Sequence, residues 1–249
     1  MKMFAIVKKN IPTPTQIVEK AIQLKLVKPY DNIKNIKKDF SKLAEELQVD
    51  AYNLYLKAEE KEGGEAIRVH LSGKVNPKAS AKEAIKEAAK MFKDLDRFFV
   101  SLTQSRRARA GEAFEVILKT LFKKLNYPFE EQQVINGKPD FLMPSRKYYD
   151  RNAMDCIIFT AKRTLRERWR QIVTEGTRGK GFFLATIDEN VSKKSLNEMK
   201  ENRIYLVMPG NIKAKAANYI DADNVIAFEE FFKHHLDPPV VRWKDKGII

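Results

Sequence analysis

The second half of the sequence alternates short apolar segments with segments of helical periodicity. The apolar segments cover residues 154–161, 182–187, 204–208 and 225–226. The helical segments that separate or follow them cover residues 192–202, 212–219 and 228–235. Strands joined by helices of about ten residues need crossover connections, which favour parallel pairing. The pattern therefore predicts an α/β fold in which helices flank a sheet whose later strands are parallel.

A β-hairpin is expected before the first of these strands. Residues 131–135 have a strand pattern, Asn136-Gly137 is a strong signal for a tight turn, and a second strand begins at Pro139-Asp140. Because a hairpin pairs antiparallel, the complete sheet is predicted to be mixed.

The N-terminal region has mainly helical patterns. Residues 33–62 show helical periodicity twice, with a break at residues 49–50 where Asp50 can cap the second helix. Both a helix-turn-helix and a plain helical hairpin fit this segment, and the degenerate motif favours the hairpin. The glycines at 63–64 are expected to form a turn before a weakly alternating edge strand at 66–71.

Two longer helices are expected next. Ser80 can cap one helix that runs towards Phe99, and an amphipathic helix then follows the basic segment at residues 105–109. The chain is therefore divided into a helical N-terminal region at residues 1–95 and an α/β core at residues 96–249.

Two segments of the core show no periodic pattern. Residues 145–151 are polar and aromatic, which indicates a loop, and the tail from Pro238 carries Trp243 but predicts no helix or strand. No internal repeat or low-complexity segment is present.

The chain is strongly basic. It contains 47 Lys and Arg residues against 33 Asp and Glu residues, which gives a formal net charge of +14. An excess of positive charge favours a polyanionic partner because each neutralised phosphate releases counterions. A lysine-rich surface that keeps the protein soluble explains the composition equally well.

The sequence also indicates the cellular compartment. Its single cysteine, Cys156, cannot form an internal disulfide and lies within an apolar run, so a reducing cytoplasm is expected. No apolar run approaches the roughly 20 residues that a membrane-spanning helix needs, and no membrane association is expected.

Three residues around the predicted first parallel strand carry the groups needed for phosphodiester cleavage. Asp140 begins the second hairpin strand, Lys162 follows strand 154–161, and Glu175 lies on the next predicted helix. Many metal nucleases place a second carboxylate two residues before the lysine, but Thr160 occupies that position here. Glu175 is the nearest downstream replacement, roughly three to four helical turns beyond Lys162.

The expected roles of these residues differ. Asp140 and Glu175, with the backbone carbonyl of Ala161, would hold Mg²⁺, which prefers hard oxygen ligands. The cation would polarise the scissile phosphate and lower the pKa of a bound water. Lys162 would orient the nucleophile and offset charge that grows on phosphorus. Taken singly each residue is more often structural, but their order on these elements favours a nuclease.

An arginine cluster follows the lysine. Arg166, Glu167 and Arg168 lie in the first half of the helix predicted at residues 164–175. Guanidinium groups can bind O6 and N7 of guanine and a carboxylate can accept from N4 of cytosine, so G·C pairs are the expected target. A solvated helix face with surface ion pairs is the structural alternative.

These segments resemble type II restriction endonucleases of the EcoRII C-terminal-domain and PspGI-like family, within the PD-(D/E)XK superfamily. The resemblance spans residues 105–175 and is carried by SRRARAGEAFE, KPDFLMPS and TAKRTLRERWRQIVTEG. It implies a restriction-endonuclease-like core with a mixed central sheet flanked by helices, and a mainly helical N-terminal extension.

The resemblance also implies site residues. It assigns catalysis to Asp140, Lys162 and Glu175 and adds an acidic residue on the preceding long helix, Glu115. From the residues alone, Glu115 lies at the margin of an apolar stripe, where a solvated position is favoured. The residues expected to contact DNA are Arg166, Glu167, Arg168 and Arg106.

The implied activity is Mg²⁺-dependent double-strand cleavage of DNA at a palindrome resembling CCWGG or CCNGG. A palindrome that is read by one asymmetric half-site reader requires two copies of the chain, so a homodimer is expected. A separately encoded DNA methyltransferase is a further expected partner. Two alternatives stay open: a non-cleaving helix-turn-helix regulator that binds DNA, and a structure-specific repair nuclease.

Overall fold

The computed structural model describes residues 3–135, 137–165 and 182–249. Within these ranges, no helix combines the length and the apolar character required to cross a membrane.

The chain forms two compact units. The helical unit contains Met1–Leu24 and Gln48–Ala113, and the sheet unit contains Lys25–Leu47 and Phe114–Ile249. The sequence placed a boundary at residue 95, whereas these units divide within a long helix at residue 113. Residues 25–47 also pack with the later part of the chain.

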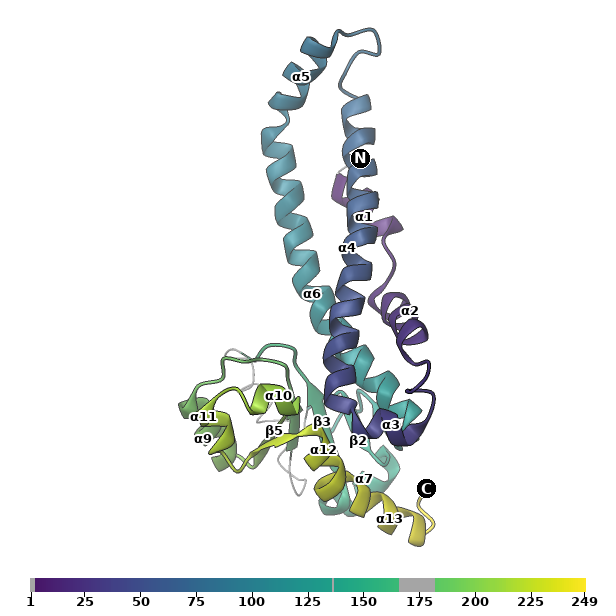
Figure 1. Cartoon of the computed structure of the whole chain (residues 1–249), viewed down its shortest axis with the longest axis vertical. Coiled ribbons are helices and arrows are strands. Elements are labelled where there is room, and N and C mark those ends of the chain that lie inside the picture. The colour runs from purple at the N-terminus through teal and green to yellow at the C-terminus, as the bar shows by residue number, and fades with distance from the viewer. Residues whose placement is uncertain (1–2, 136, 166–181) are drawn as a thin grey trace. The chain divides into compact units, whose positions relative to one another are not determined.

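The sheet unit contains six described strands, which lie in the sheet in chain order. Figure 1 labels β2, β3 and β5 among them. They are β1 (Glu130–Glu131), β2 (Phe141–Met143), β3 (Ile157–Ala161), β4 (Phe182–Ala185), β5 (Ile204–Met208) and β6 (Val225–Ala227). The pairs β1–β2 and β2–β3 are antiparallel, and β3 through β6 pair in parallel. The predicted mixed sheet is therefore confirmed.

The first strand is shorter than predicted. β1 ends at Glu131, and Gln132 adopts a positive φ of 50°, which interrupts an extended strand. The predicted strand at residues 131–135 is therefore wrong beyond its first residue. Asn136, part of the predicted tight turn, lies outside the described residues.

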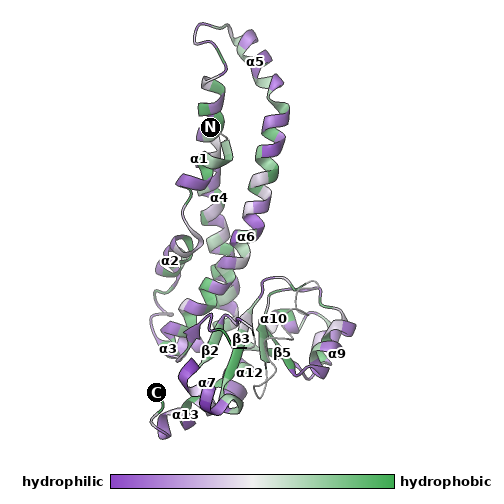
Figure 2. Cartoon of the chain, turned by 180° about the vertical axis from the view of Figure 1, so that it is seen from behind, coloured by the Kyte–Doolittle hydropathy of each residue, from purple (hydrophilic) through white to green (hydrophobic). Residues whose placement is uncertain are grey.

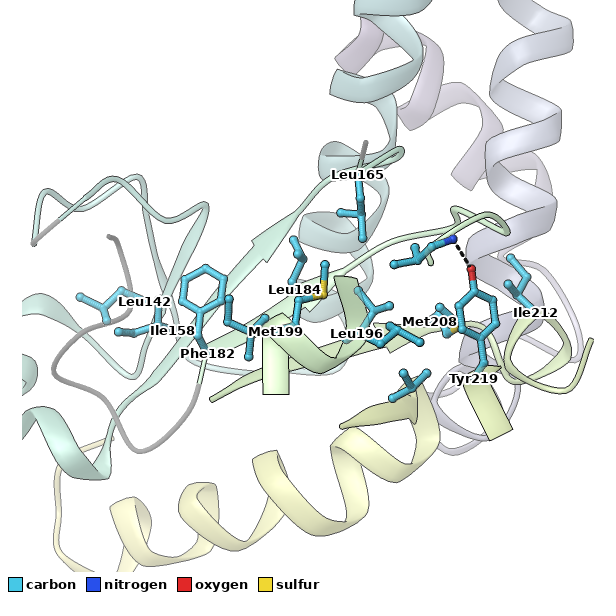
Figure 3. Close-up of a cluster of buried hydrophobic side chains, with 14 of the residues drawn as sticks. Leu142, Ile158, Leu165, Phe182, Leu184, Leu196, Met199, Met208, Ile212 and Tyr219 are labelled. Carbon is cyan, nitrogen blue, oxygen red and sulfur yellow. Dashed lines mark hydrogen bonds between the residues drawn. The ribbon is translucent and has the colours of Figure 1, made fainter. Parts of the chain in front are cut away.

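One face of the sheet is covered by a mainly aliphatic core (Figure 3). Ile158, Leu184 and Leu206 are each 0% exposed and alternate with residues that point to the other face. Leu196 and Met199 of α9 (Lys193–Glu201) pack onto this face. Leu165, which follows β3, belongs to the same cluster.

The opposite face is covered mainly by aromatic rings. Phe122 of α6 (Phe92–Lys124) lies 5.3 Å from Phe159 of β3, measured between ring centroids. Phe40, at the start of α4 (Phe40–Ser72), lies 4.8 Å from Phe232 in an edge-to-face arrangement. Such pairs add to the stabilisation that burial gives, so this face is a rigid support for the strands.

Several shorter helices complete the sheet unit. They are α3 (Ile33–Lys38), α7 (Arg146–Asn152), the 3₁₀-helix η1 (Ala153–Asp155), α10 (Gly210–Lys213), α11 (Ala217–Ile220), α12 (Phe228–Phe231), the π-helix η3 (Phe232–Leu236) and α13 (Asp237–Asp245). The single helix predicted at residues 212–219 is thus two short helices.

Two segments predicted to be irregular are helical. Ser145 caps α7 by accepting a hydrogen bond from the Tyr148 amide at 3.3 Å, so the predicted loop at residues 145–151 is wrong. The C-terminal tail forms α13, whose two prolines lie in the first turn, where they do not interrupt helical hydrogen bonds. Trp243 is completely buried and donates to the Asp155 carbonyl at 3.2 Å, which fixes α13 to the sheet unit.

The helical unit contains α1 (Met3–Asn10), most of α2 (Pro14–Lys25) and the longer parts of α4 and α6, with α5 (Ala81–Lys90) between them. In both views α4 and α6 run side by side within this unit (Figures 1 and 2). Ser80 forms a capping box with Glu83 at the start of α5, as its predicted role as a cap requires.

The N-terminal pattern was misinterpreted at α4. This helix is continuous through residues 49–50 and through the two glycines at 63–64, so both the helix-turn-helix and the favoured helical hairpin are wrong. The predicted edge strand at residues 66–71 is helical as well. Asp50 lies inside the helix and is not an N-cap.

Candidate active site

The sheet brings Asp140 and Lys162 to the same edge. Asp140 directly precedes β2, and Lys162 directly follows β3. Because Phe141 pairs with Phe159 in the antiparallel register, the start of β2 lies beside the end of β3. Lys162 Nζ is 3.2 Å from Oδ2 of Asp140.

The Asp140 carboxylate is held by backbone as well as by the lysine. The residue is only 7% exposed, and its Oδ2 accepts a 2.8 Å hydrogen bond from the Ala161 amide. Such donors and a nearby cation offset the loss of hydration that burial imposes on a carboxylate. Lys162 is 38% exposed on its side chain, so the ammonium reaches both the carboxylate and solvent.

Thr160 has a structural role in this arrangement. Its hydroxyl accepts a 3.3 Å hydrogen bond from the Asp140 amide, and the residue is 1% exposed. Many metal nucleases carry their second carboxylate at this position. Here the Thr160 side chain instead helps to fix the backbone of Asp140.

The donor set is suited to a hard cation. Oδ2 of Asp140 accepts from Ala161 and Lys162, whereas no hydrogen bond from the described residues reaches Oδ1. Carboxylate oxygens such as Oδ1 of Asp140 are the hard ligands that Mg²⁺ prefers. No group of three or more His, Cys, Asp or Glu side chains suited to a metal occurs among the described residues. The second predicted ligand, Glu175, lies outside them.

The other predicted site residues fall into two groups. Arg166, Glu167 and Arg168, like Glu175, lie outside the described residues. Glu115 is half-buried on α6, within the sheet unit.

Arg106 lies in the helical unit. It forms an ion pair with Glu59, with 2.5 Å between Nη2 and Oε1. Glu59 is 4% exposed and also accepts a hydrogen bond from the Tyr55 hydroxyl, so the arginine neutralises a buried charge. Its predicted contact with DNA stays a prediction.

Two polar residues that the sequence interpretation did not select lie at the same edge of the sheet. Thr186 donates to the Arg163 carbonyl at 3.2 Å, and Asp188 accepts from the Leu165 amide at 2.9 Å. Both follow β4, the neighbour of β3. A Thr-x-Asp sequence directly after a buried strand was the available signal, because parallel strands align their carboxyl ends.

Comparison with known proteins identifies the family. The family model for the EcoRII C terminal region matches residues 75–232. The type II restriction enzyme SsoII from Shigella sonnei is 32% identical over 150 residues, which cover 55% of this chain and 48% of SsoII. This chain therefore spans about half the length of that relative.

Solved structures agree with this result. Metal-depleted Ecl18kI in complex with uncleaved, modified DNA matches 97% of this chain and 84% of its own chain, with a TM-score of 0.81 and 25% identity. The restriction endonuclease PspGI–substrate DNA complex matches 96% of both chains, with a TM-score of 0.65 and 21% identity.

These matches confirm the predicted restriction-endonuclease-like core with its helical N-terminal region. They also confirm homology to type II restriction enzymes. The chain belongs to the EcoRII C-terminal family.

Proposed function

We propose that this protein is a Mg²⁺-dependent type II restriction endonuclease that cuts both strands of DNA at a palindrome resembling CCWGG or CCNGG. The observation that carries the proposal is the contact between Asp140 and Lys162 at one edge of the sheet. Family membership supports the reaction class, and the DNA in the Ecl18kI and PspGI complexes supports DNA as the substrate.

Asp140 and Glu175, with the carbonyl of Ala161, are the proposed metal ligands. When bound, Mg²⁺ supplies Lewis-acid polarisation of the scissile phosphate and a water of lowered pKa. Lys162 is held by Asp140 on one side and exposed on the other, so its ammonium can meet a phosphate oxygen and offset developing negative charge. Glu115 is the proposed additional acid of the site.

Recognition of the DNA sequence is assigned to residues 166–168, which follow β3 and Lys162 in the chain. Arg166 and Arg168 would bind guanine edges, and Glu167 would accept from cytosine. Their position in the chain, four to six residues after Lys162, couples recognition to cleavage. Arg106 is proposed to add a contact to DNA from the helical unit.

The proposed assembly is a homodimer, in which residues 1–95 contribute dimer and DNA contacts. A palindrome presents the same half-site twice, and a two-fold dimer presents the same reader twice. The helical unit exposes large apolar side chains that a second copy can cover: Phe92 is 76% exposed and Phe99 is 52% exposed. A separately encoded DNA methyltransferase is the further proposed partner.

One of the two alternatives loses its basis. The DNA-binding regulator required a helix-turn-helix, and α4 is one continuous helix instead. A structure-specific repair nuclease would use the same metal site and is separated from the proposal by its products.

The test is digestion of a plasmid that carries one CCWGG site, with a matched plasmid from which the site is removed. In Mg²⁺ the proposal expects one discrete linear product from the first plasmid and none from the second. Nicking of both plasmids would identify a nuclease that ignores sequence. Intact DNA across a panel of plasmids that carry every CCNGG variant would refute cleavage at such sites.

A further inference from the structure

The segment between the lysine and the arginine cluster is fixed by the turn that follows β4. The Lys162 amide donates to the Ala185 carbonyl at 2.9 Å, which continues the β3–β4 pairing by one residue. One residue later, the Thr186 hydroxyl donates to the Arg163 carbonyl at 3.2 Å. Asp188 Oδ2 then accepts from the Leu165 amide at 2.9 Å.

These contacts attach residues 163–165 to residues that are themselves largely buried. Thr186 is 0% exposed and Leu165 is 1% exposed, and Leu165 packs into the aliphatic core (Figure 3). Only one residue, Thr164, separates the two side-chain anchors along the chain. The path of the backbone from Lys162 to Leu165 is therefore set by the β4 turn and not by the lysine's own side chain.

The anchoring turn is itself held by a closed set of hydrogen bonds. The Asp188 amide donates to Thr186 Oγ1 at 3.1 Å, and Asp188 Oδ1 accepts from the Asn190 amide at 3.0 Å. The Tyr219 hydroxyl donates to the Asp188 carbonyl at 3.1 Å and accepts from the Val191 amide at 2.8 Å. Polar groups that satisfy one another in a connected network of this kind favour one arrangement.

We infer that Thr186 and Asp188 are positioning residues that fix the register between the cleaving lysine and the base-reading residues that begin at Arg166. This inference rests on the proposed function. A side chain that must approach a phosphate and another that must approach a base edge tolerate little relative displacement, since catalysis and readout are both sensitive to small errors in placement. Neither Thr186 nor Asp188 needs to touch DNA for this role.

Substitutions can remove single contacts while keeping side-chain volume. Thr186→Val removes the hydroxyl and keeps the shape, and Thr186→Ser keeps the hydroxyl. Asp188→Asn leaves one acceptor oxygen for two amide donors, and Asp188→Ala leaves none. Glu189→Ala is the matched control, because Glu189 lies in the same turn but is exposed and pairs only with Lys215 among the described residues.

The experiment measures single-turnover cleavage in Mg²⁺ on a cognate duplex and on a duplex with one outer C·G pair replaced. Thermal unfolding and binding of the cognate duplex in Ca²⁺ are measured in parallel. For Thr186→Val and Asp188→Ala, we expect the cognate rate to fall by about tenfold or more and the ratio of the two rates to shrink. Thr186→Ser and Glu189→Ala should keep both the rate and the ratio.

The outcomes separate the inference from the proposed function. If the wild-type protein cuts neither duplex, the proposed function fails and the inference fails with it. If the wild-type protein cuts, but Thr186→Val and Asp188→Ala keep the wild-type ratio of rates, the positioning role is wrong. A loss of rate that merely follows the fraction of unfolded protein, with an unchanged ratio, also overturns it and leaves the proposed function intact.

Discussion

Asp140 illustrates how one residue depends on its neighbours at the end of a strand. Its carboxylate is almost fully buried, yet a backbone amide and an ammonium group offset the loss of hydration. The amide belongs to Ala161 and the ammonium to the next residue, so a single strand end provides both. Any displacement of that strand end would therefore alter the carboxylate and the lysine together.

Cys156 provides a residue-scale prediction. Burial raises the pKa of its thiol to about 12, and the nearby Asp155 charge adds to the shift. At pH 8 this raised pKa should make the thiolate population of Cys156 roughly a thousandfold lower than that of an ordinary thiol. The thiolate is the form that reacts with alkylating agents. Alkylation with iodoacetamide, followed by mass spectrometry, should be correspondingly slow in the native protein.

The same reaction in guanidinium chloride is the control, since unfolding exposes the thiol. We expect rapid modification there. Rapid alkylation of the native protein at pH 8 would contradict the buried environment of Cys156.

At the scale of elements, the continuous helix α4 predicts that Gly64→Ala stabilises the protein, whereas a turn at residues 63–64 predicts that it destabilises the protein. Gly64 is exposed within the helix, and a Cβ built there meets nothing within 4 Å. Alanine should therefore stabilise the protein by about 0.5 to 1 kcal/mol, because it loses less backbone entropy in a helix than glycine does. Chemical denaturation of Gly64→Ala and the wild-type protein measures the difference.

Gly247 is a control for this measurement. Its φ is +63°, so Gly247→Ala should destabilise the protein. If Gly64→Ala were destabilising as well, the turn expected from the sequence would regain support over the continuous helix.

The elements differ in how far the sequence could predict them. β3 and β5 were predicted because their residues are apolar and β-branched over a full strand length, and Figure 2 shows β2, β3 and β5 as mainly hydrophobic. The continuity of α4 could not be predicted from its residue pattern. Paired glycines are a turn signal locally, and only packing of the helix along its length overrides them.

The candidate site was predictable in part for a related reason. Parallel and antiparallel pairing determines which strand ends meet, so Asp140 and Lys162 could be placed at one edge from the strand pattern alone. The contacts of Thr186 and Asp188 depend on the course of the turn after β4, for which the sequence has no periodic signal. Helix α13 was not predicted because two consecutive prolines are a signal against a helix, although they lie in its first turn. The hydrogen bond and burial of Trp243 hold this helix in place.

For the whole molecule, self-association is the first prediction. The apolar side chains of Phe92 and Phe99 are seven residues apart, which places them on one face of α6. The wild-type protein should sediment as a dimer of 28.8 kDa chains, and Phe92→Glu combined with Phe99→Glu should shift it to monomer. Sedimentation velocity over a range of concentrations provides the measurement.

Ile220→Glu is the matched control for this prediction, because Ile220 is an apolar residue of the sheet unit that is 59% exposed. It should leave the dimer unchanged. A monomeric wild-type protein would contradict the dimer, and a dimeric double variant would exclude this face as its interface.

The proposed function depends on Asp140 and Lys162 acting together as the cleaving centre of a DNA endonuclease. The most direct test compares wild-type protein with Asp140→Ala and Lys162→Ala for single-turnover cleavage of a CCWGG duplex in Mg²⁺, with binding of the same duplex measured in Ca²⁺. We expect the wild-type protein to cut this duplex, and each variant to lose cleavage by at least about a hundredfold while it still binds the site. Cleavage by either variant at the wild-type rate would contradict this role.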